Sequence, residues 1–323
     1  MTARFVLDEW SWLEATGTDR GALSNAVDRL LERLDVARER NEGIVRHQDY
    51  YWTDLGDGVQ LYSVLFDANC PLKFDHDLTV RLSLALDRII EFDDSKLSEY
   101  DAEFCGRMQF TPGVAWAHAC CSSQHQVAVL PLPLGGVPSG TVPVVVGGVT
   151  NEITFVTEEF QHLDFFLSVI DLENANEAMF ECLAPSAFPA LEWADNVWSG
   201  LGDFDRPYIA VRGELVRYLG GLNDYGASCF HELRAGDPRQ LQRILSAKVG
   251  TETSDENGET KRNPPSRRDR TRGYRGENKV FWWHVKLQPH IDRIYFLYEP
   301  PSADWPVPEH GRIVVGVFRD HCI

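Results

Sequence analysis

In the first half of the chain, short apolar runs alternate with stretches in which apolar residues recur every three or four positions. The runs at 4–8 and 59–66 predict buried strands, and later runs predict strands at 126–132, 143–148 and 152–156. Three helices are expected between them, from the spacing of Leu23, Val27, Leu30, Leu31 and Leu34, from that of Leu78, Leu82, Leu86, Ile89 and Ile90, and at 113–123. This alternation of strand and helix indicates an α/β layer with a partly parallel sheet.

The second half has a different pattern. Residues 158–247 show helical spacing throughout, including a proline-initiated helix at 189–201. Residues 249–279 carry almost no apolar side chains, which is typical of a polar linker. Strands return at 279–287, 292–298 and 311–319.

These patterns predict an α/β protein with four parts. An N-terminal mixed α/β layer domain covers residues 1–157, and a helical extension packed on it covers 158–248. A basic linker at 249–279 leads to a small antiparallel β module at 280–323.

Composition supports a folded chain of about two domains: 323 residues, of which 43% are hydrophobic. Seven cysteines, an odd number with no C-x-x-C pair, favour free thiols in a reducing cytoplasm over a disulfide framework. No segment reaches the roughly 18 consecutive apolar residues of a membrane span, so we expect a cytoplasmic protein with no membrane partner.

The charge is unevenly distributed. The chain has a net charge of −18, but residues 261–279 hold eight Lys or Arg against two acids. An acidic surface repels phosphates, so this basic segment is the part expected to contact RNA. Its candidate nucleic-acid-binding residues are Arg267, Arg268, Arg270, Arg272 and Arg275.

The C-terminal strands carry further basic and titratable groups, among them His284, Lys286, Arg293 and His321. The strand R-I-Y-F at 293–296 and the ending I-V-V-G-V-F-R-D-H at 313–321 resemble the RelE/ParE superfamily of small toxins. That resemblance implies an antiparallel sheet packed on helices. It also implies basic residues and a terminal histidine around a scissile phosphate, with Arg293 and His321 at the matching positions.

Metal-free cleavage of RNA needs a base, an acid and fixed positive charge on the phosphate. His321, Arg293, Lys286 and His284 are therefore the candidate catalytic residues of a ribonuclease-like toxin or defence protein that uses no cofactor. An alternative from another class is a non-catalytic scaffold, whose basic segment docks RNA or a protein partner.

The N-terminal strand suggests a third possibility. The segment R-F-V-L-D-E-W-S-W, with the strand–helix order, resembles PIN-like nucleases, in which a strand-terminal acid holds a metal ion. Asp8 would take that role here, and further acids would come from Glu42, Asp93 and Asp94. Such a site would bind Mg²⁺ or Mn²⁺.

Overall fold

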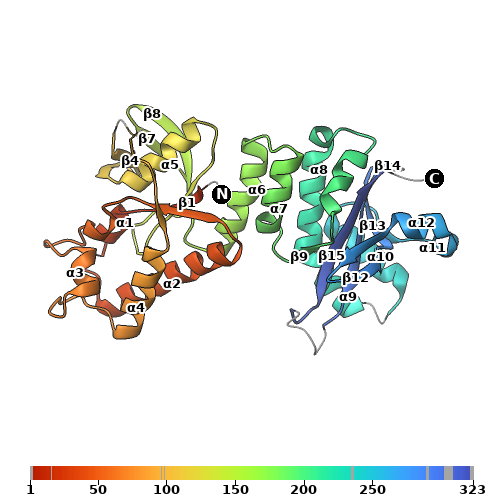
Figure 1. Ribbon diagram of the computed structural model, residues 1–323, viewed down its shortest axis with the longest axis horizontal. Coiled ribbons are helices and arrows are strands. Elements are labelled where there is room, and N and C mark those ends of the chain that lie inside the picture. The colour runs from red at the N-terminus through yellow and green to blue at the C-terminus, as the bar shows by residue number, and fades with distance from the viewer. Residues whose placement is uncertain are drawn as a thin grey trace. The chain divides into compact units, whose positions relative to one another are not determined.

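The computed structural model describes residues 3–15, 17–95, 97, 99–233, 236–288, 291–301 and 308–320. The chain forms two compact units, residues 1–173 and 174–323. Each unit has its own sheet with helices, which confirms the predicted α/β class (Figure 1). Every described helix is too short or too polar to cross a membrane.

The first unit contains an eight-stranded sheet in the order β3-β2-β1-β6-β8-β7-β4-β5. The five strands from β3 to β8 in that order run parallel, and the remaining three pair antiparallel. The bounds are β1 (Ala3–Leu7), β2 (Gly43–Arg46), β3 (Ile90–Glu91), β4 (Asp101–Phe104), β5 (Arg107–Phe110), β6 (Ala128–Leu130), β7 (Gly140–Val146) and β8 (Val149–Phe155).

The helices of this unit begin where the sequence provides caps. Asp19 accepts hydrogen bonds from the first amides of α2, and Asp75 caps α4 in the same way. The apolar side of α5 packs with β1 and β8 in the core, where Val6, Val114 and Phe155 are fully buried. The bounds are α1 (Trp10–Leu13), α2 (Arg20–Glu39), η1 (Tyr50–Trp52), α3 (Leu61–Phe66), α4 (His76–Asp87), α5 (Pro112–Ser122) and α6 (Glu159–Leu172).

One predicted strand of this unit is wrong. Residues 59–66 contain the helix α3, which buries Leu61, Val64 and Leu65 and exposes Tyr62 and Phe66. The buried positions are three and four apart, a helical spacing. The aromatic and β-branched composition favoured a strand, but burial follows the helical period.

The second unit is built on a five-stranded sheet in the order β10-β13-β14-β15-β9, in which only β9 runs parallel to its neighbour. The bounds are β9 (Leu191–Trp193), β10 (Thr253–Asp255), β13 (Trp283–Gln288), β14 (Ile291–Glu299) and β15 (Arg312–Arg319), with a separate hairpin of β11 (Thr271–Tyr274) and β12 (Glu277–Val280). Its helices are α7 (Glu177–Ala187), η2 (Val197–Asp203), α8 (Tyr208–Gly221), η3 (Leu222–Gly226), α9 (Ala227–Leu233), α10 (Pro238–Val249), α11 (Gly258–Arg262) and α12 (Pro264–Asp269). The second and third predicted C-terminal strands correspond to β14 and β15, whereas the first, at 279–287, spans the end of β12 and most of β13.

The structure divides the chain differently from the four predicted parts. Of the predicted helical extension at 158–248, only α6 belongs to the first unit; the rest lies in the second. Within the expected helix at 189–201, residues 191–193 form β9, because they pair with the buried residues Ile313–Val315 of β15.

The expected linker at 249–279 also has structure of its own. It contains β10, α11, α12, β11 and β12. Hydrogen bonds and ion pairs hold this segment in place. The Ser246 hydroxyl accepts a hydrogen bond from the amide of Thr253 and donates one to its carbonyl oxygen, and Arg270 forms a buried ion pair with Glu256. These polar contacts leave no apolar pattern in the sequence, which explains the misassignment.

Candidate functional site

A polar pocket of about 420 Å³ lies in the second unit, between the face of β13–β14 and the helices α11 and α12. Cross-strand register builds its floor, since His284 lies opposite Tyr295 and Lys286 lies opposite Arg293. Alternate residues of a strand share one face, so all four side chains are on the same side of the sheet. The lining residues are Ser254, Asp255, Glu256, Asn257, Glu259, Thr260, Asn263, Ser266, Arg270, His284, Lys286 and Arg293.

Two arginines share one buried carboxylate at the floor of this pocket. Oε1 of Glu256 lies 3.0 Å from Arg270 and 3.3 Å from Arg293, and the Glu256 side chain is only 7% exposed. The Tyr295 hydroxyl donates to the same oxygen at 3.4 Å and accepts a hydrogen bond from Arg270 at 3.1 Å. Two guanidinium charges thus face a single carboxylate, which leaves the floor with one excess positive charge.

Some donors at the floor are not used. The Nε atoms of Arg270 and Arg293 form no hydrogen bond within the part of the chain that the structure describes. Both residues are more than nine-tenths buried. A buried donor without an acceptor costs free energy, so an acceptor that reached these atoms would be bound favourably.

His284 is electrically neutral in this setting. Its burial, together with the positive charges of Arg293 and Lys286, lowers the pKa of the imidazole to about 3. Its Nε2 atom lies 3.2 Å from the Ser254 hydroxyl. A neutral imidazole of such low pKa can donate or accept a hydrogen bond, but it is a poor proton donor near pH 7.

The rim of the pocket carries two ion pairs and one further acid. Lys286 pairs with Glu252, and Lys261 pairs with Asp255, each at 2.5 Å, while Glu259 adds a carboxylate. The excess positive charge is therefore confined to the two floor arginines, and the charged lining residues as a whole are three acids and three bases.

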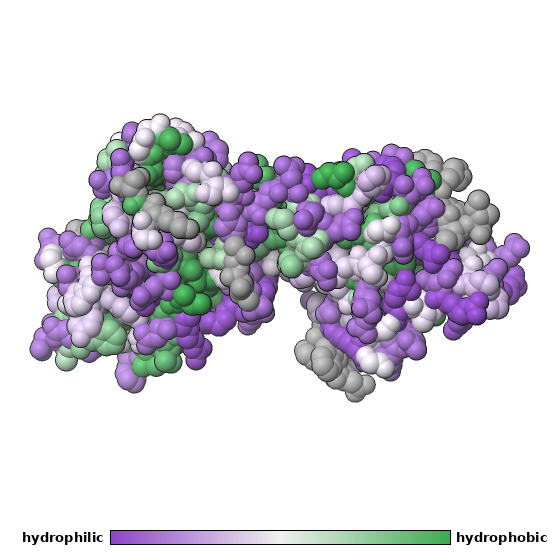
Figure 2. All heavy atoms as spheres, turned by 45° about the horizontal axis from the view of Figure 1, so that its top comes forward, coloured by the Kyte–Doolittle hydropathy of each residue, from purple (hydrophilic) through white to green (hydrophobic). Residues whose placement is uncertain are grey.

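The five arginines predicted to bind nucleic acid lie in four different settings. Arg270 belongs to the pocket floor, while Arg272 bonds backbone carbonyls and Arg275 pairs with Glu192 and Glu299. Arg267 and Arg268 are exposed on α12 and pair with no carboxylate among the described residues. Hydrophilic side chains cover this end of the second unit, at the right of Figure 2.

The structure thus brings together three of the four predicted catalytic residues, His284, Lys286 and Arg293. The fourth, His321, lies outside the described residues. Glu256 and Tyr295 were missed, although Tyr295 is two residues from Arg293 on the same strand, a period-2 signal available from the sequence.

Asp8 serves the fold of the first unit. It is fully buried, and its carboxylate accepts hydrogen bonds from the amides of Trp10 and Ser11 and from the Thr111 hydroxyl. Burial raises its pKa. These bonds fix the turn from β1 into α1.

The other acids predicted for a metal site have separate partners. Glu42 bonds His162 at 2.6 Å, Asp94 bonds His47 and Tyr100, and Asp93 accepts from the amide of Ser95. No group of three or more His, Cys, Asp or Glu residues suited to a metal ion occurs in the described ranges.

Glu9, next to Asp8, is a second buried acid with a raised pKa. Burial, followed by the negative charge of Asp8, raises the pKa of its carboxyl to about 8. One of its oxygens, Oε2, accepts the amide of Gly113 at the start of α5 at 2.9 Å. No sequence pattern indicates that Glu9 is buried, because an acid after a strand is usually exposed.

Comparisons with protein families, with curated proteins and with solved structures found no match for this chain.

Proposed function

We propose that this protein is directed to RNA and that the pocket of the second unit binds a backbone phosphate. The observation that carries the proposal is the pair of floor arginines, which share one carboxylate and keep two unused Nε donors beside a neutral His284. Phosphate oxygens are strong acceptors for guanidinium groups, and a bound phosphate would supply the missing acceptors.

The surface next to the pocket supports a polymer as the ligand. Ser266 of α12 and Asn263, which caps that helix, line the pocket, and the same helix exposes Arg267 and Arg268. These two cations would contact the phosphates that flank the one held at the floor. The acidic remainder of the chain would repel a polyanion, which confines binding to this surface.

The proposed role of this pocket is to bind RNA, not to cleave it. We assign RNA cleavage to no described residue, since the neutral His284 is a poor general acid.

The variant Arg267→Ala/Arg268→Ala is expected to bind single-stranded RNA about tenfold more weakly than the wild type at low salt. Each lost phosphate contact should also reduce the slope of log affinity against log salt by about 1. Fluorescence anisotropy of a labelled oligonucleotide, measured over a salt series, gives both quantities. The matched control is Arg239→Ala/Arg243→Ala, which removes the same charge from the exposed face of α10.

A second variant tests the pocket itself. Ser266→Trp places a large side chain at the pocket lining and is expected to weaken RNA binding while α12 remains folded, as circular dichroism would show. Equal affinities for the two double variants, together with unchanged binding by Ser266→Trp, would overturn the proposal.

A further inference from the structure

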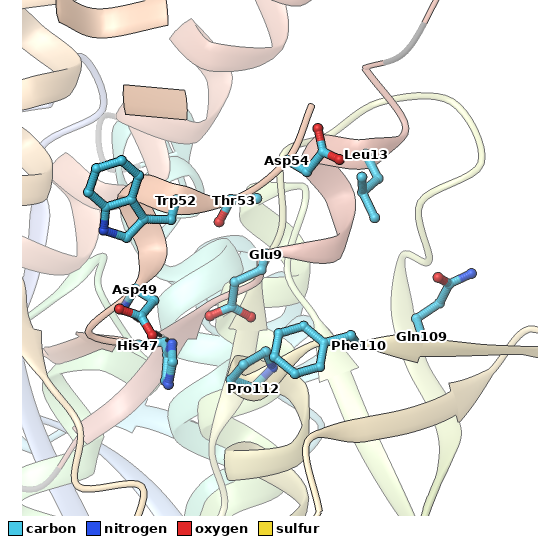
Figure 3. Close-up of a pocket in the computed structure, with 10 residues that line it drawn as sticks. All are labelled: Glu9, Leu13, His47, Asp49, Trp52, Thr53, Asp54, Gln109, Phe110 and Pro112. Atoms are coloured by element: carbon cyan, nitrogen blue, oxygen red, sulfur yellow. Dashed lines mark hydrogen bonds between the residues drawn. The ribbon is translucent and has the colours of Figure 1, made fainter. Parts of the chain in front are cut away.

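A larger cavity, of about 590 Å³, lies in the first unit at the carboxyl ends of β1 and β2 (Figure 3). In open α/β sheets ligands bind at this edge, where neighbouring connections leave in opposite directions. Here β1 has β2 on one side and β6 on the other, which is such a switch point. The lining residues are Glu9, Leu13, His47, Asp49, Trp52, Thr53, Asp54, Gln109, Phe110 and Pro112.

Glu9 lies in the middle of this cavity in Figure 3, above Phe110 and Pro112. Glu9 is only 7% exposed. While Oε2 accepts the Gly113 amide, Oε1 accepts no hydrogen bond from any described residue. The described lining holds no lysine or arginine, whereas Asp49 and Asp54 add two more carboxylates. Burial without a cationic partner favours the protonated form of this carboxyl, and a positive ligand would favour the ionised form instead.

Two aromatic side chains at the cavity are unusually exposed. Trp52 is 54% exposed and Phe110 is 62% exposed. Trp52 stacks on Tyr62 with ring centroids 5.1 Å apart, which holds its ring in place. Aromatic faces beside carboxylates attract cations through the ring quadrupole as well as through charge.

We infer that this cavity binds a small organic cation, an amidinium, guanidinium or amine on a flat apolar body, with its charged group at Glu9 Oε1 and its body against Trp52 and Phe110. The acidic lining would repel a phosphate or carboxylate ligand. The volume lies within the range of cavities that hold small molecules. The inference is independent of the RNA site, which is in the other unit.

Benzamidine and benzamide test this inference as a matched pair, since both are flat rings of similar shape and only benzamidine is charged. Because the pKa of the Glu9 carboxyl is about 8, isothermal titration calorimetry with the full chain is carried out at about pH 9, where Glu9 is ionised, and should show benzamidine binding about tenfold or more tightly than benzamide. Glu9→Gln should remove this preference, because the amide oxygen can still accept from Gly113 but the negative charge is gone. Glu32→Gln, an exposed acid on α2, is the control and should bind as the wild type does.

Trp52→Ala is a second test variant, in which benzamidine binding is measured without changing a buried side chain. Its ring is exposed, so folding should persist, and benzamidine binding should weaken severalfold. Equal affinity for the two ligands in the wild type, or absence of benzamidine binding at millimolar concentration, would overturn the inference even if Glu9→Gln failed to fold.

Discussion

Alanine at position 113 is expected to destabilise the first unit by about 3 kcal/mol, at the upper end of the cost of overpacking. A Cβ atom added to Gly113 would lie 2.1 Å from the carbonyl oxygen of Leu7 and 3.1 Å from Oε2 of Glu9. The first contact is with backbone at the end of β1, which cannot rotate away as a side chain could. Either α5 or the end of β1 must therefore move, and the core they share would be disrupted.

Urea unfolding followed by tryptophan fluorescence measures this effect, because Trp10 and Trp12 are buried in the first unit. Gly135→Ala is the matched control: its added Cβ would meet no atom within 4 Å, and its stability should stay within about 0.5 kcal/mol of the wild type. If the two variants unfold at the same urea concentration, the close approach of α5 to β1 is not as described.

Glu256→Gln is expected to lower the free energy of unfolding of the second unit by about 3 kcal/mol. Glutamine keeps the shape and an acceptor oxygen, but Arg270 and Arg293 then face each other with no buried negative charge between them. Inorganic phosphate should raise the melting temperature of this variant more than that of the wild type, because a bound anion replaces the lost carboxylate.

Glu252→Gln provides the comparison. Glu252 is 58% exposed and pairs with Lys286, so its loss should cost less than about 1 kcal/mol. Similar melting temperatures for the two variants, with and without phosphate, would contradict the role given to Glu256 as the charge partner of both arginines.

Periodicity predicted most of the regular elements, because burial of one face leaves a clear pattern in α2 and α4, and the continuous burial of residues 292–296 leaves an apolar run in β14. Apolar periodicity did not predict the elements that are held in place mainly by polar contacts. The 249–279 segment buries Arg270 through Glu256 and Tyr295, and no apolar spacing marks that choice. In the same way β9 forms because β15 offers it a partner distant in sequence.

The candidate site was predicted in part. His284, Lys286 and Arg293 share a strand face by their period of two and their register, so grouping them followed from the sequence. Glu256 reaches them from the residue after β10, and such a long-range contact is not encoded in local pattern. The sequence predicts a polar linker at 249–279, yet Arg270 within it is 4% exposed.

The edge strands of the eight-stranded and five-stranded sheets affect whether the protein aggregates at high concentration. The outermost described strands are β3 and β5 in one sheet and β10 and β9 in the other, with lengths of 2, 4, 3 and 3 residues. Short edge strands offer a neighbouring molecule little free backbone for strand addition. Fibril formation would first require one of these edge strands to unfold and expose the strand beside it. The native chain should therefore remain in solution under conditions in which partly unfolded chains aggregate.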